Sequence, residues 1–372
     1  MIAATLLLGI GDSVSGTFLM LYGTDAVGLS PAAAGTLLSA VSLGGMIASV
    51  VRGRWYDRAP SRLPAIVSVA GSVVGFALLT LATSSLVLLA LAAVFLGASG
   101  ATFPQLFTLA RGHLDVAGQA ERGTPALRSV WSAAWAIGPL IGGALLAWSG
   151  FTWLFVTAAA TFALVAVAVW LLGPPPVGSA KKMEGRQRLP RRMVLAVIGF
   201  GLFHTAMFVG SVVLPLFVTR EVDGSYGNVG LAFSVCAAVE VLAALALTFL
   251  PARWSRRRLI VLGMVLFTAH FVIIALAPNV LVVLLAQAVR GGAISLVLAL
   301  GITYFQDLLP DQPGRATALL ANSGAAGSLA AGIVGGSLAQ AIGYRPAHLV
   351  CAAVSVVAAA VLARGLARPP DS

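Results

Sequence analysis

Charge is scarce in this chain. Charged residues make up 9% of the 372 residues, whereas hydrophobic residues make up 59%. A soluble domain carries roughly 25% charged residues, so this chain could not cover a water-exposed surface with polar groups. The mean hydropathy of +0.99 therefore predicts an integral membrane protein with the lipid bilayer as its surroundings.

Cysteine and catalytic motifs are scarce as well. The two cysteines, Cys236 and Cys351, lie in apolar runs without metal-ligand neighbours, which argues against a disulfide framework or a metal site. The sequence has no Gly-Lys-Ser/Thr phosphate-binding loop, which argues against direct ATP coupling. No nucleophile and base stand together either, so we expect no enzyme, no cofactor and no metal.

Acidic residues are few compared with basic ones, and the net charge is +11. The cations fall in short loops between apolar runs, which is typical of the cytoplasmic loops of membrane proteins and not of nucleic-acid binding. If both termini are cytoplasmic, all Lys and Arg except Arg220, Arg290 and Arg345 lie on that side or close to it. We expect a multi-pass protein of the cell inner (cytoplasmic) membrane.

The apolar runs predict helices. They reach about 20 residues and lack the alternation of barrel strands. Asp12 interrupts the first run, so we interpret this run as a membrane span and not as a cleaved signal peptide. The predicted spans lie at about residues 2–22, 32–51, 63–83, 86–110, 126–148, 151–172, 193–218, 229–250, 259–277, 280–309, 316–342 and 347–366.

A basic, proline-containing segment at residues 174–192 divides these spans into two sets of six. It predicts a cytoplasmic linker between bundles at residues 1–173 and 193–372. The two halves also resemble each other. Arg54-Trp55 is matched by Arg253-Trp254, and a Gly-Gly pair in the fifth span is matched by a pair in the eleventh. Parallel repeats of this kind are typical of major facilitator transporters.

Two motifs resemble gating elements of that superfamily. The loop RGRWYDRAPSR carries Asp57 and Arg58, which by this resemblance form a charged latch; the alternative is simple anchoring by positive charge. In the fifth span, Gly138 and Pro139 resemble a motif of proton-driven antiporters. The alternative for this pair is close helix packing by small residues.

Arg128, Trp131 and Trp135 share one face of the fifth span by their spacing. A guanidinium group beside two indole rings could bind a sugar, because it offers donors for hydroxyls and flat faces for the ring. The alternative is that Arg128 extends to the membrane surface and the tryptophans pack.

Other polar residues are embedded in apolar spans, where one charge costs about 2.5–3.5 kcal/mol on insertion scales. Burial favours the protonated form of a carboxyl group, so Asp12 and Glu240 are candidate proton-coupling residues. The alternative for each is a permanent ion pair, with Arg290 as a possible partner. We interpret His204 and His270 as packing residues.

The chain resembles the bacterial sugar efflux transporter family of the major facilitator superfamily over nearly its whole length. The residues that carry this resemblance are Arg128, Glu240, Asn322 with Ser323, and the motifs PQLFTLAR (104–111), AWAIGP (134–139) and YFQDLLP (304–310). Asp12 and Arg290 depart from the family pattern, which keeps multidrug or metabolite efflux open as an alternative. A third alternative is a sensor or scaffold without transport.

The resemblance implies an all-α membrane protein with twelve transmembrane helices in two pseudo-symmetric six-helix bundles. It implies proton-driven export of a small-molecule substrate, a sugar or glycoside, by alternating access in a monomer. By the same resemblance Gln105, Arg128 and Asn322 bind substrate, and Gln306 and Asp307 belong to a gate. No nucleic-acid partner is implied.

Overall fold

The computed structural model describes residues 1–81, 86–116, 120–173, 189–249 and 254–364, which are helical apart from short turns. Two compact units are present. Unit 1 comprises Met1–Ser30 and Thr36–Glu184, and unit 2 comprises Pro31–Gly35 and Gly185–Ser372. Most of the predicted linker, residues 174–188, lies outside the described residues, so the linker stays a prediction.

Unit 1 is an α-helical bundle. Its elements are α1 (Ile2–Gly16), α2 (Leu19–Leu21), the π-helical turn η1 (Tyr22–Ala26), α3 (Pro31–Arg58, whose first turn belongs to unit 2), α4 (Leu63–Leu81), α5 (Leu86–Ser99), α6 (Thr102–Val116) and α7 (Ala120–Leu171). α1, α2 and η1 together make one apolar span, and α5 and α6 make another. An aromatic core of Tyr22, Phe76, Phe155 and Phe162 holds α4 against the second half of α7.

α7 contains two membrane spans. At Gly150 the backbone leaves helical geometry, with φ 75° and ψ −177°, a combination that is strained for any residue with a Cβ. This break coincides with the predicted boundary between the fifth and sixth spans. Eleven helices in the described part of the chain are long and apolar enough to cross a membrane. With α7 divided at Gly150, the predicted twelve spans are confirmed.

The predicted spans at residues 86–110 and 126–148 leave residues 111–125 as a predicted loop, and this prediction is wrong for the residues that the structure describes. α6 continues to Val116 and α7 begins at Ala120. A drop in hydrophobicity marks the edge of the membrane span and not the end of the helix. Backbone hydrogen bonds can continue into water as long as the residues tolerate a helix.

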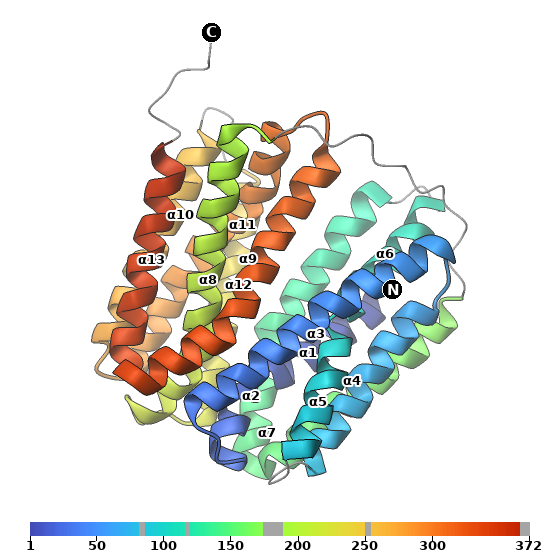
Figure 1. Cartoon of the computed structure of the whole chain (residues 1–372), viewed down its shortest axis with the longest axis horizontal. Helices are drawn as coiled ribbons and strands as arrows, with labels where there is room; N and C mark the ends of the chain where they lie inside the picture. Colours follow the sequence, from blue (N-terminus) through green and yellow to red (C-terminus); the bar gives the residue numbers. More distant parts are fainter. Residues whose placement is uncertain (82–85, 117–119, 174–188, 250–253, 365–372) are drawn as a thin grey trace. The chain divides into compact units, whose positions relative to one another are not determined.

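Unit 2 is a second α-helical bundle (Figure 1). Its helices are α8 (Arg191–Arg220), α9 (Tyr226–Leu247), α10 (Arg256–Leu276), α11 (Val280–Leu308), α12 (Pro313–Ile342) and α13 (Tyr344–Arg364). The side chains of Ser225, Ser255 and Asn279 accept hydrogen bonds from the first turns of α9, α10 and α11, which satisfies free backbone donors there.

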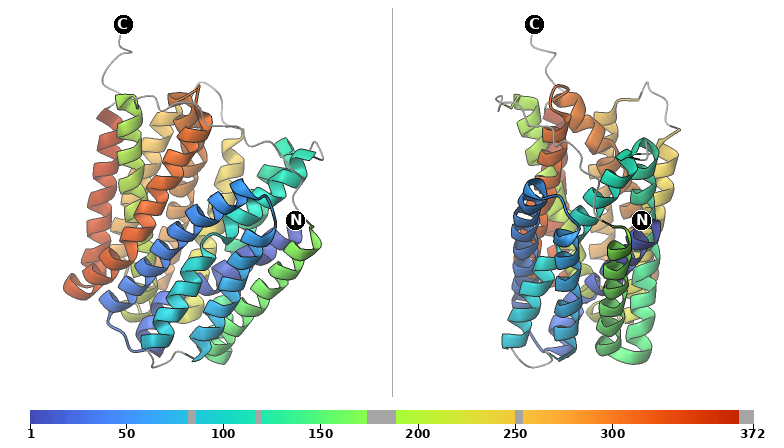
Figure 2. Two further views of the ribbon diagram at one scale, coloured as in Figure 1. Left: turned by 45° about the vertical axis from the view of Figure 1, so that its right-hand side comes forward. Right: turned by 90° about the vertical axis from the view of Figure 1, so that its right-hand side faces the viewer.

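The core of unit 2 is rich in phenylalanine. Phe203, Phe267 and Phe271 form a chain of ring contacts with centroids 4.9 Å apart at each step, and Phe200 meets Phe305 at 5.0 Å. α13 lies against both α8 and α10, as the turned views show (Figure 2). This packing places α8 and α11, which carry the polar groups described below, inside a rigid bundle.

Candidate functional site

Asp12 lies in the last third of α1 and near the middle of the span Ile2–Ala26, and α1 is the helix that packs most extensively against α7. Its side chain is half-buried, and no hydrogen bond or ion pair reaches its carboxylate within the described part of the chain. The neighbouring Ser13 hydroxyl donates to the carbonyl oxygen of Gly9 at 2.7 Å and lies 3.3 Å from that of Ala134 on α7. The structure therefore places Asp12 beside a tight helix crossing, where no described residue forms a salt bridge with it.

Glycines make this crossing possible. A Cβ atom at Gly138 would lie 1.9 Å from the hydroxyl oxygen of Ser13, and one at Gly142 would lie 2.5 Å from the carbonyl oxygen of Val14. Both distances are shorter than the contacts that Cβ atoms make in proteins, so α1 can approach α7 this closely only where these side chains are missing. Close packing thus accounts for Gly138 and the buried Pro139 beside it, and their gating role stays a prediction.

The face of α7 that was predicted to bind sugar is partly covered by contacts with a neighbouring helix. The ring of Trp131 lies 4.4 Å from the ring of Phe103 on α6, and Trp135 is half-buried one helical turn further along. Gln105 on α6 is buried, with 5% of its surface exposed. The backbone of Arg128 belongs to α7, and its side chain lies outside the described residues. Gln105 and Trp131 thus come from packed helices, while their contact with substrate stays a prediction.

A polar cluster surrounds Arg290 in α11. Its guanidinium group is buried, with 6% of the residue exposed, and lies over the ring of Phe233 on α9 with 5.6 Å from Cζ to the ring centroid. Nη1 donates to Oε1 of Gln287 at 3.2 Å, and Nη2 donates to the hydroxyl of Ser211 on α8. Gln287 and Ser211 were not among the site residues predicted from the sequence. The spacing of three between Gln287 and Arg290, which places them on one helix face, could have revealed the first.

Glu240 is on the helix that faces this cluster. A Cβ at Gly291, next to Arg290, would lie 3.0 Å from the backbone nitrogen of Glu240 and 2.3 Å from the carbonyl oxygen of Cys236. α9 and α11 therefore approach closely at the level of both charged residues. The bundle brings the segments of Glu240 and Arg290 together, which agrees with either proton coupling or an ion pair.

The two histidines named in the sequence analysis, His204 and His270, both make polar contacts with a neighbouring helix. His204 on α8 lies 3.2 Å through Nδ1 from the hydroxyl of Ser323 on α12, and His270 on α10 lies 2.9 Å through Nδ1 from the carbonyl oxygen of Ala286. Both side chains are buried, so each joins two helices. Asn322, beside Ser323, is exposed on unit 2, and its substrate role stays a prediction.

The predicted gate residues in unit 2 connect helix ends. Asp307 at the end of α11 pairs with Arg256 at the start of α10, and the amide of Gln306 donates to Thr317 on α12 at 3.1 Å. Both contacts lie at the same end of unit 2 as the first turn of α8, which is the predicted cytoplasmic end. A gate at this position stays a prediction.

The predicted latch residues in unit 1 differ from those in unit 2. Asp57 and Arg58 are exposed at the end of α3 and make no ion pair with any residue the structure describes. Their neighbour Arg62 instead stacks on Trp170, with 3.9 Å from Cζ to the ring centroid, and donates to its carbonyl oxygen at 2.7 Å. Arg52 donates to Ser68 at 2.8 Å. The latch stays a prediction, and the basic residues around it fasten helices within unit 1.

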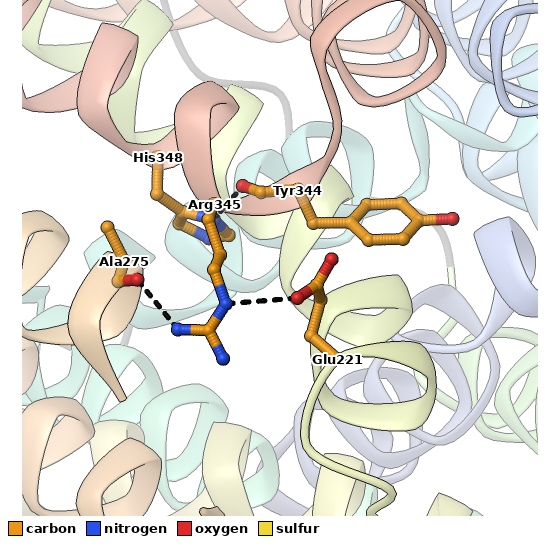
Figure 3. A network of polar contacts seen from close by, with 5 residues as sticks. All are labelled: Glu221, Ala275, Tyr344, Arg345 and His348. Carbon is orange, nitrogen blue, oxygen red and sulfur yellow. Dashed lines mark hydrogen bonds and ion pairs between the residues drawn. The ribbon is translucent and has the colours of Figure 1, made fainter. Parts of the chain in front are cut away.

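A polar network that was not predicted from the sequence lies at the opposite end of unit 2 (Figure 3). Nε of Arg345 at the start of α13 donates to Glu221 at 3.0 Å, and its Nη1 donates to the last turn of α10 at Ala275 at 2.8 Å. His348 bonds through Nδ1 to the carbonyl oxygen of Tyr344 at 2.9 Å. The network joins α8, α10 and α13. Its main pair is 124 residues apart, so no local pattern announces it.

The chain matches the profile of a known protein family along its whole length. The profile of the Major Facilitator Superfamily matches residues 1–222 and 196–372, and so covers all 372 residues. The chain belongs to the major facilitator superfamily. This family consists of transporters, so this major facilitator is a multi-pass membrane protein and not an enzyme.

Relatives in the superfamily cover nearly the full length. A Deinococcus radiodurans protein to which sugar efflux transport is ascribed is 33% identical over 98% of this chain and 97% of its own length. Sugar efflux transporter A of Dickeya chrysanthemi is 27% identical over 96% and 93%. Sugar efflux transporter A of Escherichia coli K12 is 26% identical over 95% and 92%.

Solved structures confirm the major facilitator fold. A crystal structure of the nucleoside transporter NupG superposes with a TM-score of 0.81 at 15% identity, covering 98% of this chain and 99% of that chain. A POT family transporter in complex with 5-aminolevulinic acid gives 0.82 at 14% identity, covering 97% and 94%. At these identities the likeness concerns the fold alone.

Proposed function

We propose that this major facilitator exports small sugars or glycosides from the cytoplasm by proton antiport with alternating access. The observation that carries the proposal is the full-length similarity to sugar efflux transporters, at 33%, 27% and 26% identity. The alignments cover 98%, 96% and 95% of this chain, so the similarity extends over both units and not over one of them alone. The basic loops support placing both termini at the cytoplasmic face of the inner membrane.

In the proposed mechanism, Asp12 and Glu240 bind and release the transported proton. Each lies in a membrane span, where a carboxylate is costly to keep ionised. Asp12 meets no ion-pair partner within the described part of the chain, so its protonation can follow the surroundings. Glu240 shares a helix crossing with the segment of Arg290, so its proton can respond to a nearby cation.

Transport in purified form tests this function. The full chain is reconstituted in proteoliposomes with an imposed pH gradient, and labelled glucose, lactose and sucrose are offered on the side from which export begins. We expect at least one sugar to move against its gradient while protons move the other way. Sugar flux that is indifferent to the pH gradient would contradict antiport, and no flux of any sugar would contradict sugar export.

Multidrug or metabolite efflux is the second candidate. The contact of Trp131 with Phe103 favours it, because an indole that is packed against another ring offers less free surface to a sugar. The same proteoliposomes loaded with a lipophilic cation and with a nucleoside separate the two functions. Export of the cation without export of sugars would favour multidrug efflux.

A further inference from the structure

The cluster around Arg290 contains buried hydrogen-bond donors that no acceptor in the described part of the chain satisfies. Nη1 and Nη2 are used by Gln287 and Ser211, but Nε of Arg290 and Nε2 of Gln287 have no hydrogen-bond partner in the part of the chain that the structure describes. Gln287 is fully buried and Arg290 is 6% exposed. Unpaired donors are costly inside a membrane bundle, so a ligand that accepts both would gain from them.

The cluster is held in place by three helices. Gln287 and Arg290 lie one turn apart on α11, Ser211 reaches them from α8, and Phe233 on α9 covers the face of the guanidinium group. Ser211 is half-buried, so the cluster extends from the interior of unit 2 toward its accessible surface. A ligand would approach past Ser211.

The charges that face the cluster limit what it can take. Glu240 is on the facing helix α9 and takes part in interactions within the chain. His270 on α10 and His348 on α13 are bonded to the carbonyl oxygens of Ala286 and Tyr344. An acidic residue is thus already present on the helix segment that packs against the segment of Arg290. This balance favours a neutral, oxygen-rich ligand over a second anion.

We propose that Arg290, Gln287 and Ser211 form a subsite of unit 2 that binds ring hydroxyls of the transported sugar. This inference rests on the proposed sugar export and names residues that recognise the substrate. Arginine offers donors in a planar fork, glutamine offers two amide donors, and serine both donates and accepts. A sugar hydroxyl can accept from the two unpaired donors and donate to the serine oxygen.

Binding to the purified full chain tests the subsite. Thermal unfolding in detergent is followed with glucose, galactose, lactose and sucrose, and with glucuronate as an acidic comparison. Gln287→Leu keeps the volume and removes the amide, so we expect the apparent Kd of the best sugar to rise about threefold to tenfold. Arg290→Lys keeps the charge without the planar fork and should weaken binding at least as much.

Ser355→Ala is the matched control. Its hydroxyl is also buried without a partner in the described part of unit 2, but it lies on α13 and takes no part in the cluster, so binding should not change. Transport kinetics give a second measurement. KM of the best sugar should rise in Gln287→Leu with kcat nearly retained. If this variant does not fold, Ser211→Ala replaces it, with the same expected direction.

The outcomes separate the subsite from the function. If sugars stabilise the wild type and both Gln287→Leu and Arg290→Lys bind them equally well, the subsite is wrong and sugar export stands. If glucuronate alone stabilises the wild type, the neutral ligand is wrong. If no sugar binds or moves in the wild type, the proposed function and the subsite both fail.

Discussion

The two units of this transporter share a helical plan but bury polar groups differently. In unit 1 the buried polar residues are mostly hydroxyls that bond to their own helix, as Ser15 and Thr17 do with carbonyl oxygens one turn earlier. In unit 2, long side chains such as His270 and Arg290 bridge neighbouring helices. Close glycine crossings occur in both units, at Gly138 in unit 1 and at Gly291 in unit 2, but among the described residues the buried arginine and histidine side chains that join helices lie in unit 2.

The kind of contact at a helix crossing determines which substitutions it tolerates. A bundle held by glycine crossings fails when volume is added, because two backbones must separate. A bundle held by bridging polar groups fails when a partner is removed, because a buried donor or acceptor is left unpaired. Asp12 lies in a membrane span of unit 1 and Glu240 lies in one of unit 2, so either unit could carry the proton.

The largest expected effect comes from neutralising these acids. In Glu240→Gln and in Asp12→Asn, acceleration of sugar export by an imposed pH gradient should fall to the rate seen without a gradient, because the amide cannot carry a proton. Sugar counterflow, which needs no net proton movement, should persist. Flux in proteoliposomes measures both.

Asp311→Asn is the control for this prediction, because Asp311 is an exposed acid in the turn between α11 and α12 and should leave coupling intact. A variant that responds to the gradient like the wild type would remove its residue from proton coupling. If only one of the two variants loses coupling, that unit alone handles the proton.

Added volume should break unit 1. Gly138→Ala places a methyl group where the hydroxyl oxygen of Ser13 would be 1.9 Å away, so we expect a loss of about 1–3 kcal/mol in stability, as for other overpacked sites. Gly53→Ala on α3 meets nothing within 4 Å and should be neutral or slightly stabilising. Thermal unfolding in detergent measures both, and equal midpoints would refute the crossing as the weak point of unit 1.

Much of this fold could be predicted because a membrane span is determined by the composition of one continuous segment. About twenty apolar residues define a span wherever it occurs, and the Gly150 boundary was visible as a glycine between two apolar runs. The loop at residues 111–125 was wrong because hydrophobicity marks the membrane and not the helix end. The hydrophobicity of a segment predicts whether it enters the bilayer, but it does not predict where the helix ends in water.

The candidate site was less predictable because its contacts join distant residues. Ser13 lies 121 residues from Ala134, and Ser211 lies 79 residues from Arg290. Embedded polarity identified Asp12, Glu240 and Arg290 as unusual, since charge in a span is costly anywhere. Which neighbour satisfies each group depends on helix rotation and packing, and these are not encoded in any one segment.

Removing one partner should weaken unit 2. Arg345→Ala eliminates the bond to Glu221 and the bond to the Ala275 carbonyl, so α13 loses these polar contacts with α8 and α10 but keeps its packing against them. The side chains are 37% and 30% exposed, which screens the pair, and we expect a loss of about 1 kcal/mol. Tyr344→Phe removes only a hydroxyl contact with Arg220 and should cost less. An unchanged unfolding midpoint for Arg345→Ala would refute the network as a structural link.

The smallest effect is expected at the other end of unit 2, where Arg256 pairs with Asp307. These side chains are 52% and 57% exposed, and exposed pairs contribute about 0–1 kcal/mol. Asp307→Asn should therefore leave the unfolding midpoint nearly unchanged. If Asp307 also belongs to a gate, transport should change while stability does not, because a gate acts on the rate of opening. Sugar flux and thermal unfolding of the same variant distinguish the two roles, and a stability loss as large as that of Arg345→Ala would show that bridging pairs hold unit 2 at both ends.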